Sequence, residues 1–246
     1  MQRMKTLLNI AGKKCIIYAD EQPQVILIQP LGEHEQTTLE AEIDAIHAAV
    51  QTPFVFAGLE ISDWEKELTP WHDPNISTSE EIGSHSFETL DYIIARLMPY
   101  LFAHYATLPV VLGGYSLAGL FARWAACKTE CFDAVAAASP SLWITGWKGF
   151  SDAHEICARY VYLSLGDREE FTRNKALAQV GDTIRWEYEH LQRTIGPDHC
   201  TLVWEKGGHF ANPHIRLARA FVWCIQSLTY SLPSKKLSER KYDRKT

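Results

Sequence analysis

A serine in the middle of the chain occupies a setting that suits a nucleophile. Residues 108–122 read LPVVLGGYSLAGLFA and contain Gly114-x-Ser116-x-Ala118, a variant of the G-x-S-x-G nucleophile elbow. In such an elbow the serine lies on a sharp turn from a strand to a helix, so the residues two before and two after it must be small. Ser116 is therefore the predicted nucleophile. The alternative is a glycine-rich turn whose serine only caps the helix.

A serine hydroxyl needs a base that takes its proton, and histidine is the usual base near neutral pH. His209 lies in the sequence KGGHF, between the last predicted strand and the last predicted helix. In an α/β-hydrolase arrangement the histidine occupies this loop, and the chain order is serine, acid, histidine. We predict His209 as the base, with His214 on the following helix as the weaker alternative.

Three carboxylates compete for the acid position that orients the histidine. They are Asp167, Glu169 and Glu170, in the GDREEF segment after a predicted strand at residues 160–165. One of them is expected to accept the Nδ1–H of His209 and stabilise its imidazolium form. We rank Glu169 first and Asp167 second, because Asp167 leaves the strand early and can instead anchor the turn.

Backbone N–H groups are expected to stabilise the oxyanion of an acyl-transfer intermediate. The N–H of Leu117 begins the helix after the serine and has no partner within that helix. A second donor should come from the loop after the strand at residues 25–30, with Leu31 as first choice and Gly32 as second.

Aromatic residues near these segments are candidates for substrate contacts. The segment 62–83 has no periodicity and holds two tryptophans, and a loop of this length inside a compact domain is often functional. Packing is an equally good interpretation of each loop tryptophan, including Trp64 and Trp147. The residues predicted to contact substrate are Tyr115, Trp71 and Trp143.

Short β-branched runs alternate with helical patterns along the chain, which predicts an α/β fold. We expect a mostly parallel central sheet with helices on both faces. The helix at 38–50 is expected to be capped by Thr37 or Thr38, and the helix at 87–105 is expected to bend at Pro99. The predicted strands are 14–19, 25–30, 54–59, 109–113, 132–138, 160–165 and 201–205, and the other predicted helices are 116–127, 172–191 and 212–228.

Composition limits the classes of protein to consider. The 246 residues carry a net charge of −6, which argues against a nucleic-acid partner because phosphate binding needs a basic surface. No apolar run reaches the length of a membrane span, and the N-terminus lacks a signal-peptide core. The six cysteines are scattered without zinc-site spacing. We therefore expect a cytoplasmic protein with no membrane partner.

We expect one α/β-hydrolase domain over residues 1–232, followed by a polar basic tail at 233–246. The insertion between the strands at 132–138 and 160–165 holds about twenty residues, which is too short for a large cap domain.

Five stretches carry a resemblance to a known family. They are ELTPW at 67–71, GGYSLAGLFA at 113–122, SPSLW at 139–143, GDRE at 166–169 and GGHF at 207–210. With them the chain resembles the putative-esterase family of α/β-hydrolases, which includes S-formylglutathione hydrolases (esterase D) and enterochelin esterases. In that family the acid often stands three residues past the glycine at the strand end, and this spacing implies Glu169.

The predicted function is hydrolysis of a carboxylic ester or thioester through an acyl-enzyme. A small-molecule ester is the expected substrate, and this chemistry requires neither a metal nor an organic cofactor. Two alternatives stay open, namely acyl transfer to an acceptor other than water and a catalytically silent binding protein of the same fold. A homodimer is also left open.

Overall fold

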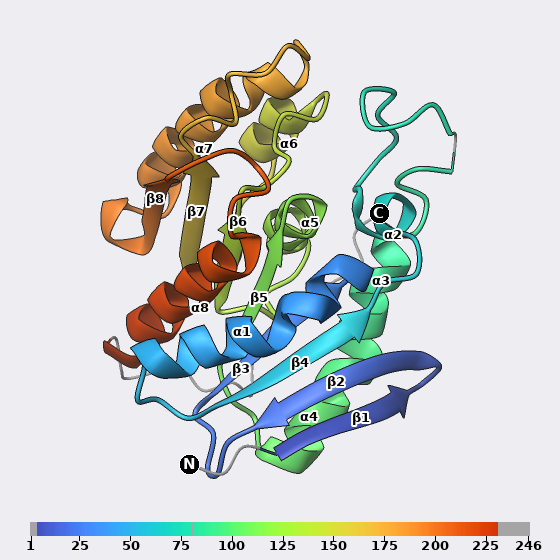
Figure 1. Ribbon diagram of the computed structural model, residues 1–246, viewed down its shortest axis with the longest axis vertical. Coiled ribbons are helices and arrows are strands. Elements are labelled where there is room, and N and C mark those ends of the chain that lie inside the picture. Colours follow the sequence, from blue (N-terminus) through green and yellow to red (C-terminus); the bar gives the residue numbers. More distant parts are fainter. Residues whose placement is uncertain (1–3, 80, 231–246) are drawn as a thin grey trace.

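The computed structural model describes residues 4–79 and 81–230, and an eight-stranded sheet forms the centre of the fold. The strands follow the spatial order β1-β2-β4-β3-β5-β6-β7-β8 (Figure 1). Their bounds are β1 (Met4–Ile10), β2 (Lys13–Ala19), β3 (Val25–Leu31), β4 (Phe54–Glu60), β5 (Val110–Tyr115), β6 (Ala134–Ala138), β7 (Tyr160–Gly166) and β8 (Cys200–Glu205).

Most of the sheet is parallel, as the sequence predicts. Strand β2 pairs antiparallel with both β1 and β4, whereas every other neighbouring pair is parallel. The carboxyl ends of β3 to β8 therefore meet at one edge of the sheet. Ligands of open α/β sheets bind outside this edge, so it is where the functional loops should converge.

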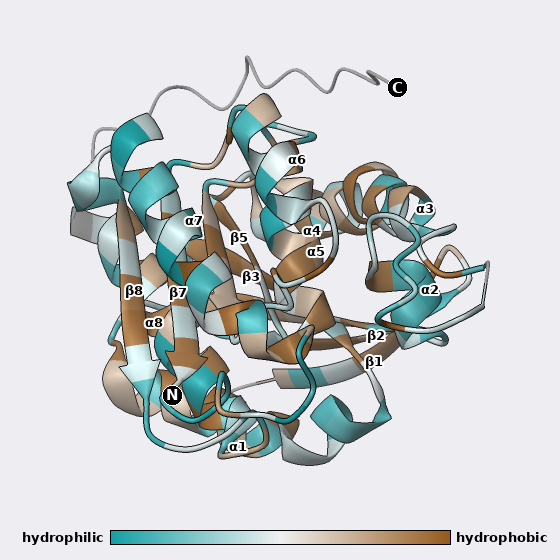
Figure 2. Ribbon diagram, turned by 90° about the horizontal axis from the view of Figure 1, so that it is seen from above, coloured by the Kyte–Doolittle hydropathy of each residue, from teal (hydrophilic) through white to brown (hydrophobic). Residues whose placement is uncertain are grey.

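Helices cover both faces of the sheet. In Figure 1, α1 (Glu33–Ala49) and α8 (Pro213–Tyr230) cross the front face, and their apolar residues join one buried cluster. The opposite face is covered mainly by α3 (Ser86–Tyr92), α4 (Met98–Tyr105), α5 (Leu117–Ala125) and α7 (Val180–Thr194), which share a second cluster. Figure 2 shows the resulting layers, with hydrophobic strands enclosed by helices that are more polar.

Several predicted boundaries are wrong, each for a local reason. Strand β1 has no predicted counterpart because it lies at the sheet edge and leaves Met4 and Leu7 more than half exposed. Helix α1 begins at Glu33 rather than near residue 38, because Gly32 is its N-cap and Glu35 accepts the Gly32 N–H at 3.1 Å. The hydroxyl of Thr37 therefore cannot cap the helix; it lies inside it and donates to the carbonyl of His34.

The helix predicted over 87–105 is interrupted just before its proline. A π-helical turn at Ile93–Leu97 joins α3 to α4, and Pro99 follows at the start of α4. Proline lacks an N–H group, and a π-turn is one way for a helix to absorb that loss. The helix predicted from 172 begins later, at Val180, after a 3₁₀ turn at Leu177–Gln179; a second such turn lies at Pro197–His199.

Short helices lie in the connections that leave the carboxyl ends of β4 and β6. Between β6 and β7 the described chain forms the seven-residue helix α6 (Trp147–Ala153), and α2 (Trp64–Leu68) follows β4. Among the described residues, no helix combines the length and the apolar character needed to span a bilayer. The tail predicted at 233–246 lies outside the described residues.

Candidate active site

Ser116 lies on a strained turn between β5 and α5. Its φ is 59° and its ψ is −118°, a conformation that residues with side chains seldom adopt. A Cβ at Gly114 would lie 2.4 Å from the carbonyl carbon of Ala118, and a Cβ at Gly113 would lie 2.4 Å from the ring of Phe221. The glycines before Ser116 are therefore required by the close approach of α5 and α8.

The structure brings together a serine, a histidine and a glutamate from three distant segments. Nε2 of His209 lies 3.1 Å from Oγ of Ser116, and Nδ1 of His209 lies 2.7 Å from Oε2 of Glu169. The His209 side chain is 32% exposed and that of Glu169 is 4% exposed. The cluster therefore runs from a buried carboxylate to a hydroxyl that is only half-buried.

The second oxygen of Glu169 is surrounded by donors. Oε1 accepts hydrogen bonds from the N–H of Gly166 at 2.7 Å, Oγ of Ser139 at 2.8 Å and Nη1 of Arg216 at 2.9 Å. Burial of Glu169 opposes its ionisation, yet the contacts with His209, Gly166 and Ser139 hold its pKa below the usual range. The carboxylate is thus held in its charged form.

The other two carboxylates of this loop have different partners. Asp167 is exposed, and its Oδ1 accepts the N–H of Gly207 at 2.8 Å. Glu170 pairs with Arg185 at 2.6 Å. Asp167 thus anchors the turn, and Glu169 is the acid that contacts His209.

Two further polar residues near Ser116 had no place in the sequence prediction. Oγ of Ser141 lies 3.3 Å from Oγ of Ser116, and the N–H of Ser141 donates to the Ser116 carbonyl at 3.1 Å. Arg216, on α8, contacts Glu169. Arg216 lies four residues before Ala220 and eight before Cys224, so the helical period places it on the buried face of α8. A charged residue on a buried helix face is a sign of a buried ion pair, and this pattern could have predicted one.

The backbone of Leu31 does not point toward Ser116. Its carbonyl accepts the N–H of Ile61, next to β4, whereas the N–H of Ile26 donates to Pro109 on the β5 side. The N–H and C=O of one strand residue face the same neighbour, and the direction alternates along the strand. Leu31 therefore faces β4, and the N–H of Gly32, the second choice, donates to Glu35.

Tyr115 supports the histidine loop rather than lining open surface. Its side chain is buried, and its hydroxyl donates to the carbonyl of His209 at 2.6 Å. The hydroxyl of Tyr115 is therefore bound by the protein itself, and its contact with substrate stays a prediction.

The two predicted tryptophans are half-buried. The indole N–H of Trp71 donates to the carbonyl of Thr145 at 2.8 Å, and Asp73 accepts the N–H of Thr145. Trp71 thus helps to fasten the loop after α2 to the segment before α6. Trp143 packs against the hydrophobic cluster on the α5 face, whereas Trp147 is buried and donates to Glu187.

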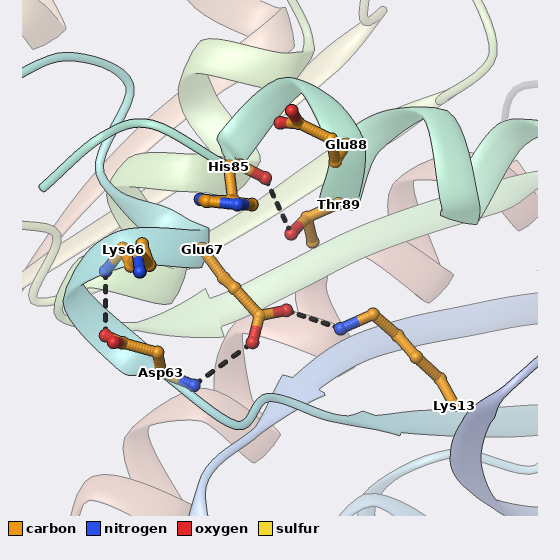
Figure 3. Close-up of a pocket in the computed structure, with 7 residues that line it drawn as sticks. All are labelled: Lys13, Asp63, Lys66, Glu67, His85, Glu88 and Thr89. Atoms are coloured by element: carbon orange, nitrogen blue, oxygen red, sulfur yellow. Dashed lines mark hydrogen bonds and ion pairs between the residues drawn. The ribbon is translucent and has the colours of Figure 1, made fainter. Parts of the chain in front are cut away.

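A polar hollow of about 290 Å³ lies between α2, α3 and the start of β2 (Figure 3). Within it, the carboxylate of Glu67 accepts the N–H groups of Ser62 and Asp63 at 2.9 and 3.0 Å and pairs with Lys13. These contacts give Glu67 of the ELTPW stretch a structural role in holding the chain that leaves β4. No group of three or more His, Cys, Asp or Glu side chains within residues 4–79 and 81–230 could hold a metal ion.

The fold and this cluster define the class of protein. A mostly parallel sheet with helices on both faces, a serine on a tight strand-to-helix turn and a histidine after the last strand are the features of α/β-hydrolases. A family model described as putative esterase matches residues 32–209. The chain therefore belongs to the putative esterase family and, with it, to the carboxylic ester hydrolases.

Solved structures with the same fold include three hydrolases. The siderophore hydrolase EstA from Aspergillus nidulans is 17% identical, with a TM-score of 0.71 over 92% of this chain and 95% of that chain. An IroE-like serine hydrolase from Shewanella oneidensis is 14% identical, with a TM-score of 0.70 over 92% and 80%. The enterobactin esterase FES from Shigella flexneri is 15% identical, with a TM-score of 0.65 over 93% and 60%. No curated protein matches the sequence.

Proposed function

We propose that this protein is a serine esterase that hydrolyses a small-molecule carboxylic ester or thioester through an acyl-enzyme. Ser116 is the nucleophile, His209 the general base and Glu169 the acid that orients the histidine. The observation that carries this proposal is the continuous chain of hydrogen bonds from Ser116 through His209 to Glu169.

Each proton has a defined place in this reaction. Nε2 of His209 takes the Ser116 proton as Oγ attacks the carbonyl carbon, and the imidazolium then protonates the leaving alcohol or thiol as the acyl-enzyme forms. A water molecule gives a proton to Nε2, attacks the acyl carbon and releases the acid while the proton returns to Ser116. Glu169 stabilises the imidazolium in both steps.

The oxyanion requires donors beside Ser116. The N–H of Leu117 is the first of α5 and is the donor we assign, a contribution of about 3 to 4 kcal/mol in comparable sites. The 31–32 segment is the proposed source of the second donor. For the Gly32 N–H to act, it must exchange its hydrogen bond to Glu35 for one to the oxyanion.

The substrate classes that we propose to test come from the structural relatives. Two of the relatives are named as siderophore hydrolase or enterobactin esterase, and both names denote ester cleavage. We therefore include siderophore esters, simple p-nitrophenyl esters and thioesters among the substrates to test.

The direct test is covalent labelling by a fluorophosphonate, with ester hydrolysis measured in parallel. Ser116→Ala should abolish both, whereas Ser141→Ala, which removes a neighbouring hydroxyl 3.3 Å away, should keep the label. Labelling that persists in Ser116→Ala, or that depends on Ser141, would refute the assignment. Wild-type protein that neither reacts nor hydrolyses any of these esters would instead favour a silent binding protein.

A further inference from the structure

Arg216 lies behind the proposed acid and is almost completely buried. Its side chain is 2% exposed, and a Cβ added to Gly166 would lie 2.9 Å from its Nη1. A buried guanidinium is costly unless opposite charge and hydrogen bonds surround it. The contacts of Arg216 therefore indicate its role.

The guanidinium contacts the loop that carries the proposed acid and the loop that carries His209. Nη1 donates to Oε1 of Glu169 at 2.9 Å and to the hydroxyl of Tyr115 at 3.1 Å. Nη2 donates to the carbonyls of Lys206 and Gly208 at 3.2 and 3.0 Å. One side chain thus joins the acid loop to the glycine-rich loop that carries His209.

Tyr115 completes this connection. Its hydroxyl accepts from Arg216 and donates to the carbonyl of His209, while Ser139 accepts from Arg216 at 3.3 Å and donates to Glu169. The positions of the carboxylate and of the imidazole therefore both depend on the guanidinium.

We propose that Arg216 is a positioning residue that also balances charge. It fixes the distance between Glu169 and His209, and its positive charge offsets part of the Glu169 charge, which weakens the attraction between that carboxylate and a protonated His209 ring. This inference rests on the proposed esterase mechanism and extends it.

The ionisable groups around this pair come from four segments. Glu169 belongs to the loop after β7 and Tyr115 to β5, and both contact Arg216 directly. Asp167 binds the N–H of Gly207 in the histidine loop, and Glu205 at the end of β8 pairs with Arg219 of α8. Within the described part of the chain, Arg216 is thus the arginine or lysine that contacts the proposed acid.

The experiment compares Arg216→Gln, which removes the charge, with Arg216→Lys, which keeps it but loses the fork that binds two carbonyls. The pH profile of kcat/KM and the NMR titration midpoint of the His209 ring are measured for each. The glutamine variant should move both midpoints upward by about one pH unit. Without the positive charge of Arg216, the Glu169 carboxylate attracts the protonated His209 ring more strongly, and unit charges a few ångströms apart interact strongly in a partly buried site. The lysine variant should keep the midpoint and lose about tenfold in kcat.

A purely structural role would lower kcat and the melting temperature but leave the midpoint of the acid limb unchanged. Midpoints within about 0.3 pH unit of wild type in a folded glutamine variant would therefore overturn the proposal. An upward shift above about 0.5 pH unit in the folded lysine variant, which keeps the positive charge, would also contradict charge balance. The NMR titration needs no turnover, so it still tests Arg216 if the protein hydrolyses no ester.

Discussion

Replacing Glu169 by glutamine should be as damaging as removing the side chain, even though the two side chains have nearly the same shape. Three donors surround Oε1, namely the N–H of Gly166, Oγ of Ser139 and Nη1 of Arg216. In Glu169→Gln the amide oxygen must occupy this place, so the NH₂ group faces Nδ1 of His209.

The amide can only donate to Nδ1, which forces the ring proton onto Nε2. Nε2 then cannot accept the proton of Ser116, which lies 3.1 Å away. Loss of the correct histidine tautomer lowers kcat by about 10⁴ in a comparable triad, which corresponds to about 5.5 kcal/mol of lost transition-state stabilisation.

The assay is kcat on a p-nitrophenyl ester, with the melting temperature measured to confirm folding. Glu169→Ala should be no worse than Glu169→Gln. The controls Asp167→Asn and Glu170→Gln should stay within about threefold of wild type. Asparagine at 167 keeps an oxygen that can accept the Gly207 N–H, and Glu170 pairs with Arg185 rather than with His209. A glutamine variant that keeps a tenth of the activity, or an equal loss in Asp167→Asn, would refute this assignment of the acid.

Two further predictions concern the framework of the site. Burial raises the pKa of Glu42 to about 8 although Gln29 donates to it. Because the folded state holds this proton more tightly than the unfolded state, the free energy of unfolding of the wild type should fall as pH rises from 5 to 8, whereas that of Glu42→Gln should not, so the variant should gain up to about 4 kcal/mol relative to the wild type over that range. Urea unfolding measures both proteins, and an equal difference between them at pH 5 and pH 8 would contradict this prediction. Gly113→Ala places a Cβ 2.4 Å from buried Phe221, so its free energy of unfolding, measured with urea, should be about 1 to 3 kcal/mol lower than that of the wild type. A variant as stable as the wild type would contradict this prediction and show that α8 can shift to make room.

The parts of this molecule that the sequence predicts well are those determined by local sterics. The elbow follows from small residues at fixed positions around Ser116, and the central strands follow from short apolar runs. The choice of Glu169 over Asp167 depends on a spacing of three residues from Gly166. Each of these signals lies within a few residues of the feature that it predicts.

The features that the sequence analysis missed depend on contacts between distant segments. Arg216 is read as an ordinary helix residue until β7 and the histidine loop are placed beside it. The direction of the Leu31 peptide groups depends on which neighbour β3 faces at that position. Tyr115 is adjacent to the serine in sequence, yet its side chain is buried and its hydroxyl donates to the carbonyl of His209, far along the chain.

Two neighbouring serines hold left-handed backbone conformations. Ser116 follows β5 with a φ of 59°, and Ser139 follows β6 with a φ of 42°, and each such conformation costs about 1 to 3 kcal/mol. A glycine at either position would relieve the strain, but it would delete the hydroxyl that faces His209 or Glu169. Selection for heat tolerance and selection for turnover therefore oppose each other at these two positions, and thermostable variants should acquire their compensating changes elsewhere in the chain.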